Sequence, residues 1–266
     1  MALVLVDTPR PHVGLITLNK PERLNSMSFG LVEALYDAID EMVADNGIWV
    51  VVLTGTGRGF CSGLDLEDRG HVPGIDGMQP ARIGIRAMEY MGDTVPALRA
   101  MPQPVIAAIN GPAYGGGMCL ALGADVRLAA ESATFSAAGI TNGLTSTELG
   151  ASWLLPRAVG MSHSAELLLT GSEIDAGEAA RIGLVSRVVP DGTVVDEAVA
   201  VAGRMCELSP FGIQMTKRTL WANLEVDSLT AAIDLENRNQ LLAGHTGNLD
   251  EAVAAFREKR KPRYRE

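Results

Sequence analysis

Two glycine-rich loops carry the residues of this chain that could take part in chemistry. The first is RGFCSGLDL at 58–66 and the second is NGPAYGGGM at 110–118. Glycine lets the backbone approach a ligand closely and leaves N–H groups outside secondary structure. The second loop also opens a helix, whose first N–H groups have no partner within it. Two N–H groups converging from these loops would form an oxyanion hole for a polarised carbonyl.

Each loop could also be a tight turn without further function, which is the commoner meaning of a single Gly-Gly-Gly after a strand. A phosphate-binding loop is disfavoured, because neither GxGxxG nor GK[ST] is present. The residues by themselves therefore predict an α/β enzyme whose substrate has a polarisable carbonyl, and no more than that.

Both loops follow short apolar runs, at 49–55 and 105–111, which are typical of strands buried on both faces. Helices are expected after Ser28, which can cap one, and near 116–123. Because helices follow strands through short glycine connections, we expect right-handed crossovers and a mostly parallel sheet. The remaining predicted strands cover 2–6, 13–18, 125–130 and 184–190.

The last quarter of the chain differs from the rest, because every periodic segment in it predicts a helix. The helices are expected at 194–207, 210–221, 228–244 and 248–260. We therefore expect two regions: an α/β core at 1–195 and a helical C-terminal region at 196–266.

Composition excludes several classes of protein. Among the 266 residues, 22 Lys and Arg against 32 Asp and Glu give a net charge of −10, which argues against nucleic acid and anionic membrane as partners. Three cysteines without CxxC spacing predict neither a disulfide framework nor a metal site. The uncharged stretch 100–124 contains prolines and glycines that disfavour a membrane span. Asp7 and Pro9 interrupt any signal-peptide apolar region, so we expect a cytoplasmic protein.

The two loops and three further segments together resemble the crotonase (enoyl-CoA hydratase/isomerase) superfamily over nearly the whole chain. The further segments are LNKPERLNSM at 18–27, the stretch 167–189 and EAVAAFREKRKP at 251–262. The resemblance implies an α/β fold, namely a spiral of ββα units with a C-terminal helical trimerisation region. It also implies a homotrimer or a dimer of trimers and an acyl-CoA thioester substrate. No cofactor is expected, because coenzyme A is part of the substrate.

The resemblance assigns roles to individual residues. The N–H groups of Leu64 and Gly116 would be the oxyanion donors that stabilise an enolate of the thioester. Phe256 and Lys259 would lie near the adenine and phosphate end, often in a neighbouring subunit of such proteins; a solvated helix end is the plain alternative. The other residues expected to contact the substrate or its CoA part are Arg23, Leu24, Ser62, Leu64, Asp65 and Gly116. For Asp65, we expect hydrogen bonding that fixes the loop rather than a part in the chemistry.

The type of reaction depends on carboxylates. Hydration is best served by two of them around one water, and the glutamate positions of the family's hydratases correspond here to Cys119 and Gly139. Glu148, eight residues before Pro156, matches the single acid of several crotonase-type isomerases. One base suffices to move a proton from carbon 2 to carbon 4, and an apolar pocket would raise its pKa toward neutrality. We expect an enoyl-CoA isomerase with Glu148 as its single acid/base.

Several alternatives remain open. Glu148 could simply stabilise the first turn of a helix, and Cys119 could be a nucleophile, although core packing fits it better. The enzyme could be an enoyl-CoA hydratase that activates water through Glu148. Thioester hydrolysis or dehalogenation is disfavoured by Thr147, which stands where a nucleophilic carboxylate would be wanted. From a different class, the chain could be a catalytically silent acyl-CoA-binding protein.

Overall fold

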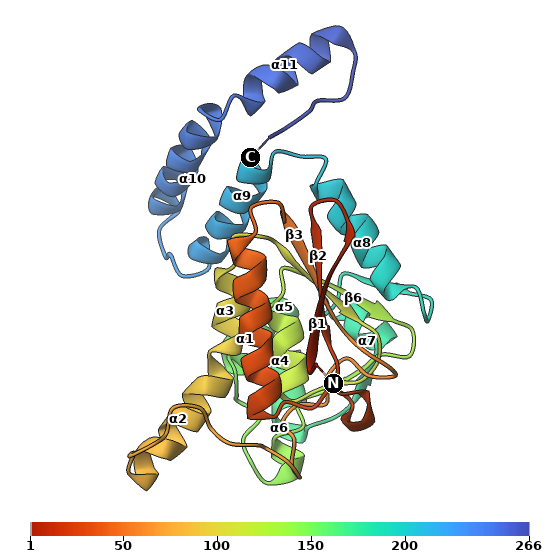
Figure 1. Ribbon diagram of the computed structural model, residues 1–266, viewed down its shortest axis with the longest axis vertical. Helices are drawn as coiled ribbons and strands as arrows, with labels where there is room; N and C mark the ends of the chain where they lie inside the picture. Colours follow the sequence, from red (N-terminus) through yellow and green to blue (C-terminus); the bar gives the residue numbers. More distant parts are fainter. Residues whose placement is uncertain (1, 266) are drawn as a thin grey trace.

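The computed structural model describes residues 2–265 and contains two β-sheets (Figure 1). The larger sheet has the strand order β1-β2-β3-β4-β6-β9, and all its neighbouring strands are parallel except β1 and β2. A smaller sheet has the order β5-β7-β8. The strands are β1 (Val4–Arg10), β2 (Val13–Leu18), β3 (Val50–Gly55), β4 (Val105–Ile109), β5 (Ala113–Tyr114), β6 (Val126–Ala130), β7 (Thr134–Ser136), β8 (Ile174–Asp175) and β9 (Arg187–Val189).

Helices connect the strands and then form the C-terminal quarter of the chain. The α-helices are α1 (Phe29–Ala44), α2 (Pro80–Gly92), α3 (Thr94–Ala100), α4 (Gly116–Gly123), α5 (Ala151–Val159), α6 (Met161–Thr170), α7 (Ala176–Arg181), α8 (Val194–Met205), α9 (Pro210–Asn223), α10 (Leu229–Gly244) and α11 (Asn248–Glu258), and the short 3-10 helices are η1 (Pro21–Arg23) and η2 (Ile140–Asn142). Within residues 2–265, no helix is long and apolar enough to cross a membrane.

The central strands are buried on both faces. Val51 and Leu53 of β3 point into the core cluster that contains α1, whereas Val50 and Val52 point to the opposite face, where α8 packs. Each fully buried Val or Leu stabilises the fold by about 1.5–3 kcal/mol, so the apolar layers on both faces hold the sheet in place. The loops at the carboxyl ends of β3 and β4 are consequently held on a rigid base.

The region after α8 lies apart from the sheet and the helices that pack on it. Figure 1 shows α10 and α11 extending from one end of the molecule, beyond α9, while α2 projects at the other end. Helix α10 has no buried residue, and α11 packs mainly on α10. These helices therefore leave large apolar surfaces uncovered in a single chain.

The predicted elements occur close to the expected positions, with small differences at their ends. The strand expected at 184–190 is shorter, because residues 182–186 form the turn that follows α7. Helix α8 packs on the sheet, so the helices that extend from the core begin with α9. The division at residues 195 and 196 remains a prediction.

Candidate active site

The two glycine loops meet backbone to backbone. Tyr114 N–H donates to the Cys61 carbonyl at 3.0 Å, and Cys61 N–H donates to the Pro112 carbonyl at 3.1 Å. Gly63 has a φ of +83°, and a Cβ there would lie 2.7 Å from the Tyr114 oxygen and 3.1 Å from the Gly116 nitrogen. Only glycine fits a position that requires both this conformation and this approach.

This contact places the two predicted oxyanion donors beside each other. Met27 N–H donates to the Gly63 carbonyl at 2.7 Å, and Asp65 N–H donates to the Met27 carbonyl at 3.0 Å. The N–H of Leu64, between them, stays outside this pairing. Gly116 opens α4, where an N–H has no partner within the helix. Within residues 2–265, neither N–H has a hydrogen-bond acceptor, so both can bind a carbonyl oxygen.

Glu148 lies next to the second loop. Its Oε1 is 3.1 Å from the position that a Cβ on Gly115 would occupy. The side chain is half-buried, and it has no ion-pair or hydrogen-bond partner among the described residues. Burial therefore raises the pKa of Glu148 above its ordinary value. An unpaired carboxylate in these surroundings can accept a proton from a substrate and return it.

The backbone around Glu148 holds it in a constrained turn. Leu149 has a φ of +46° and Gly150 a φ of +85°, and the left-handed conformation costs a residue such as leucine about 1–2 kcal/mol. The Glu148 carbonyl accepts hydrogen bonds from Ala151 N–H and, at 3.5 Å, from the Cys119 thiol. Helix α5 begins at Ala151, so the alternative that Glu148 belongs to the first turn of a helix is wrong.

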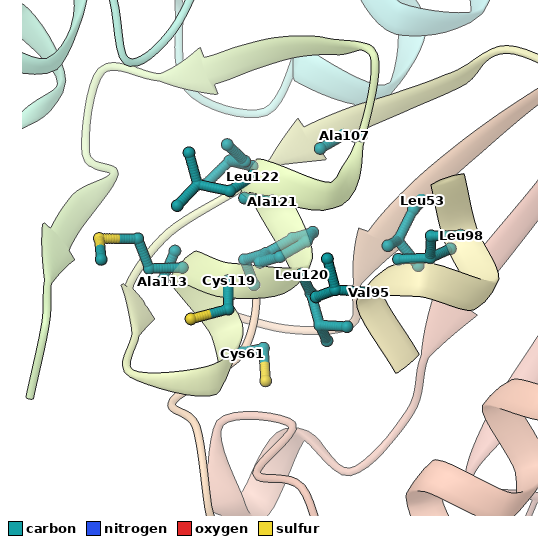
Figure 2. Close-up of a cluster of buried hydrophobic side chains, with 14 of the residues drawn as sticks. Leu53, Cys61, Val95, Leu98, Ala107, Ala113, Cys119, Leu120, Ala121 and Leu122 are labelled. Carbon is teal, nitrogen blue, oxygen red and sulfur yellow. The ribbon is translucent and has the colours of Figure 1, made fainter. Parts of the chain in front are cut away.

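Neither of the two positions at which the family's hydratases carry a glutamate provides a catalytic carboxylate here. Cys119 is buried in the apolar cluster drawn in Figure 2, where Cys61 lies near it. Burial and the nearby Glu148 raise the pKa of the Cys119 thiol, so it stays neutral and is a poor nucleophile. At Gly139, a Cβ would lie 2.1 Å from the Thr145 carbonyl oxygen, which leaves no room for a side chain.

Four of the residues expected to contact CoA gather where η1 meets the first loop. Ser62 N–H donates to the Leu24 carbonyl at 3.0 Å, and the Ser62 hydroxyl donates to the Arg23 carbonyl at 3.3 Å. The Arg23 guanidinium donates at 2.9 Å to Asp65 and also binds Glu67. These contacts bring the predicted residues together, and their contact with CoA remains a prediction.

Asp65 is occupied by groups of the protein itself. Its carboxylate is only 1% exposed, and the ammonium of Lys20 and the guanidinium of Arg23 both bind it at 2.9 Å. Ser26 Oγ and the N–H groups of Glu67 and Asp68 donate to it as well. Arg23 and the other hydrogen-bond donors hold the pKa of Asp65 well below its usual range, against the opposing effect of burial. The carboxylate thus fastens the first loop to the turn before α1.

Sequence reasoning did not identify these partners or those of Tyr114. The segment LNKPERLNSM contains Lys20 and Ser26, but nothing in its pattern shows that both reach a residue about forty positions further on. Likewise, the Tyr114 hydroxyl reaches Glu173, 59 positions away. Such pairs become visible only when the fold brings distant segments together.

The two predicted residues of the last helix lie far from the loops in the chain's own fold. Phe256 is 85% exposed on α11, and Lys259 ends that helix with a φ of +54°. Figure 1 shows α11 at the end of the molecule beyond α9, apart from α4 and α5. A contact between these residues and the CoA of a neighbouring subunit remains a prediction.

The described part of the chain holds no group of three or more His, Cys, Asp or Glu residues that could bind a metal ion. The polar arrangement therefore consists of two free N–H donors and one carboxylate of raised pKa. That arrangement can stabilise an oxyanion while a proton moves on a neighbouring carbon.

Comparisons with known proteins identify the family of the chain. The sequence model of the enoyl-CoA hydratase/isomerase family matches residues 10–266. The chain is 51% identical over 263 residues to the "Probable enoyl-CoA hydratase EchA12" of Mycobacterium tuberculosis, covering 98% of this chain and 92% of that protein.

Solved structures give the same result. The crystal structure of a "probable enoyl-CoA hydratase/isomerase" from Mycobacterium abscessus superposes with a TM-score of 0.94 at 47% identity, covering 100% of this chain and 99% of that one. A structure named as a "monofunctional enoyl CoA isomerase" from M. smegmatis, also 47% identical, has a TM-score of 0.75 and covers 88% of this chain and 99% of its own. The chain therefore belongs to the enoyl-CoA hydratase/isomerase family, and it is an enzyme of the crotonase type and fold.

Proposed function

We propose that this enzyme shifts the double bond of a 3-enoyl-CoA to the 2-position, with Glu148 as its single acid/base. The observation that carries the proposal is the placement of one unpaired, half-buried carboxylate beside Gly115, next to the two free N–H groups of Leu64 and Gly116. A second free carboxylate at either hydratase position would have favoured hydration instead.

The proposed reaction needs only these groups. The thioester oxygen binds the N–H groups of Leu64 and Gly116, and the Glu148 carboxylate removes a proton from carbon 2. The electrons of that C–H bond move into a dienolate whose oxygen the two donors stabilise. The Glu148 carboxyl then returns the proton to carbon 4, which leaves the double bond between carbons 2 and 3. At the end, Glu148 is again a carboxylate and the substrate has been neither oxidised nor reduced. The reaction therefore requires no cofactor, since CoA is part of the substrate.

The surroundings of Glu148 support proton transfer in both directions. Its pKa is raised by burial and no cation lowers it, and general acid–base catalysis is most efficient when the pKa lies near the working pH. The isomerase name of the M. smegmatis relative supports the same reaction.

Hydration of a 2-enoyl-CoA is the second candidate, favoured by the hydratase name of the M. tuberculosis relative. Glu148 would then activate a water molecule without a second carboxylate. The buried thiol of Cys119 and the closed position of Gly139 disfavour this reaction. A silent acyl-CoA-binding role would leave the raised pKa of Glu148 without use.

An ultraviolet assay with two substrates separates these functions. Isomerisation of 3-hexenoyl-CoA creates the absorbance of a conjugated thioester, whereas hydration of crotonyl-CoA removes it. We expect purified protein to increase absorbance with the first substrate much faster than it decreases absorbance with the second. Comparable rates would contradict the assignment, and binding of both thioesters without a signal would indicate a silent binder.

The proposal extends to assembly and location. The uncovered apolar side chains of α10 and α11, such as Leu241 and Phe256, support a homotrimer or a dimer of trimers in which Phe256 and Lys259 reach the CoA of a neighbouring subunit. Arg23, Leu24 and Ser62 would bind the same CoA from within the subunit. The expected place of this enzyme is the cytoplasm.

A further inference from the structure

We propose that Tyr114, together with Glu173, positions the Gly116 N–H and thereby sets the strength of the oxyanion hole. The inference rests on the proposed function and concerns a side chain that takes no part in the proton transfer. Tyr114 belongs to the second glycine loop and stands two residues before the donor. Its backbone contacts the first loop, and its side chain points to the other strands of the small sheet.

The Tyr114 hydroxyl joins three strands that are each very short. It donates to the Glu173 carboxylate at 2.5 Å, directly before β8, and lies 2.7 Å from the hydroxyl of Thr134 in β7. A carboxylate only accepts and a phenol has one proton, so Thr134 must donate to Tyr114. The hydroxyl therefore connects β5 to both β7 and β8.

The register between β5 and β7 determines where the donor points. Tyr114 pairs with Ser136, and Gly115 N–H donates to the Ser136 carbonyl at 2.8 Å. Gly115 then turns with a φ of +49° and a ψ of −119°, which orients the next N–H, that of Gly116. A shift of β5 along β7 would therefore rotate this donor away from the substrate oxygen.

Strand β5 has only two residues, and its backbone pairing with β7 covers just those two. So short a pairing defines its register weakly. Hydrogen bonds to charged acceptors are the stronger kind, and the contact with Glu173 is of this kind. The Tyr114 side chain thus adds an anchor on the β7 and β8 side to the backbone contacts that β5 makes with the first loop.

Two substitutions test the inference, Tyr114→Phe and Glu173→Gln, and Tyr36→Phe is the matched control. Tyr36 is also half-buried and donates one hydrogen bond, to the Tyr90 carbonyl at 2.8 Å, but it lies on α1. Tyr114→Phe removes one hydroxyl from the anchor, and Glu173→Gln keeps an acceptor for it. The measurements are kcat and KM with 3-hexenoyl-CoA, and the red shift in absorbance when 2,4-hexadienoyl-CoA binds, because polarisation of the carbonyl causes that shift.

Loss of a whole oxyanion donor typically costs about 100- to 1000-fold in rate, and a misdirected donor costs part of that. We expect Tyr114→Phe to lower kcat about tenfold, with KM changed less than twofold and a smaller red shift. Glu173→Gln keeps an acceptor but removes its charge, so it should lower kcat less than Tyr114→Phe does, and Tyr36→Phe should resemble the wild type. A Tyr114→Phe protein with full kcat and full red shift would overturn the inference, as would a change confined to KM.

The two proposals can fail separately. If the wild type binds hexadienoyl-CoA with a red shift but does not isomerise hexenoyl-CoA, the proposed function is wrong, and the red shift of Tyr114→Phe still decides the role of Tyr114. If the wild type isomerises and Tyr114→Phe behaves like Tyr36→Phe, only the role of Tyr114 is wrong. A wild type that neither isomerises hexenoyl-CoA nor gives a red shift with hexadienoyl-CoA overturns both.

Discussion

At the scale of single residues, the site depends on one carboxylate that is left unpaired and another that is fully paired. Glu148 is half-buried and has no hydrogen-bond or ion-pair partner among the described residues, so its pKa is raised. Asp65 accepts hydrogen bonds from two cations and three further donors, so its pKa is lowered. The free carboxylate takes up a proton more readily than an exposed glutamate does, and the paired one stays charged and holds the loop.

The raised pKa of Glu148 makes the folded protein less stable once this carboxyl ionises. Below the ordinary value of 4.5 the group is protonated in both states and carries no penalty; stability is lost as the pH rises through the raised folded pKa. We therefore expect Glu148→Gln to unfold at a higher temperature than the wild type at pH 7, and at an equal temperature below pH 4. Thermal unfolding at both pH values measures this, and a less stable variant at pH 7 would contradict the assigned burial.

Asp65 should show the opposite dependence. Its lowered pKa contributes stability above the ordinary value of 3.8, and that stability is lost as the pH falls through the lower folded pKa. Asp65→Asn leaves Lys20 without a charged partner and Arg23 with Glu67 alone. We expect this to cost about 3 kcal/mol at pH 7, the lower end for a broken buried pair, because Arg23 is partly exposed. Urea unfolding at pH 7 and at pH 3.5 should show a smaller difference at the lower pH. An equal difference at both would exclude the charge as the cause.

At the scale of elements, the long buried strands and helices could be predicted from the sequence, but the small sheet could not. The apolar run ending at Gly55 indicates β3 because it is continuous and β-branched. Strands β5 and β8 have two residues each, too few for any periodic signal. Their pairing comes from segments distant in the sequence, so the anchor of Tyr114 could not be predicted either.

The same distinction applies within the candidate site. Leu64, Gly116 and Glu148 are predicted from their positions in the motifs. The fold brings their loops together, and their roles remain predictions. The sequence does not show why residue 139 is a glycine, because the reason is the close approach of the Thr145 backbone. Such a steric conflict is visible only in the three-dimensional structure.

Gly139 provides a test of how tightly the segment before Glu148 is packed. Its φ of −54° suits any residue, so only the 2.1 Å approach of a Cβ to the Thr145 oxygen opposes a side chain. We expect Gly139→Ala to lower stability by about 1–3 kcal/mol, as overpacking does, and to reduce activity by displacing Glu148. The control is Gly84→Ala in α2, where a Cβ meets nothing within 4 Å and alanine should stabilise by about 0.5–1 kcal/mol. Urea unfolding measures both, and a neutral Gly139→Ala would contradict the packing.

At the scale of the whole molecule, the uncovered C-terminal helices set the expected assembly. Leu229, Leu241 and Phe256 are all more than 60% exposed in the single chain. Large apolar side chains that stay this exposed on two packed helices favour an interface. A chain that buries them against copies of itself would also bring α11 to a neighbouring site.

Light scattering should therefore give three or six times the 28.1 kDa of one chain. Leu241→Asp should reduce the measured mass to that of a smaller species, because it places a charge in the interface. Val43→Asp, at an exposed apolar residue of α1, is the matched control and should leave the mass unchanged. A monomeric wild type would contradict the proposed assembly.

The central claim is that Glu148 alone moves the proton, and the rate of conjugated-thioester formation from 3-hexenoyl-CoA by two matched variants tests it most directly. Glu148→Gln keeps the shape of the side chain and removes the base, while Glu166→Gln makes the same change at an exposed residue of α6. We predict that Glu148→Gln lowers kcat by about 100-fold or more, as expected for loss of a general base, while Glu166→Gln matches the wild type. A Glu148→Gln enzyme with the wild-type kcat would contradict the account.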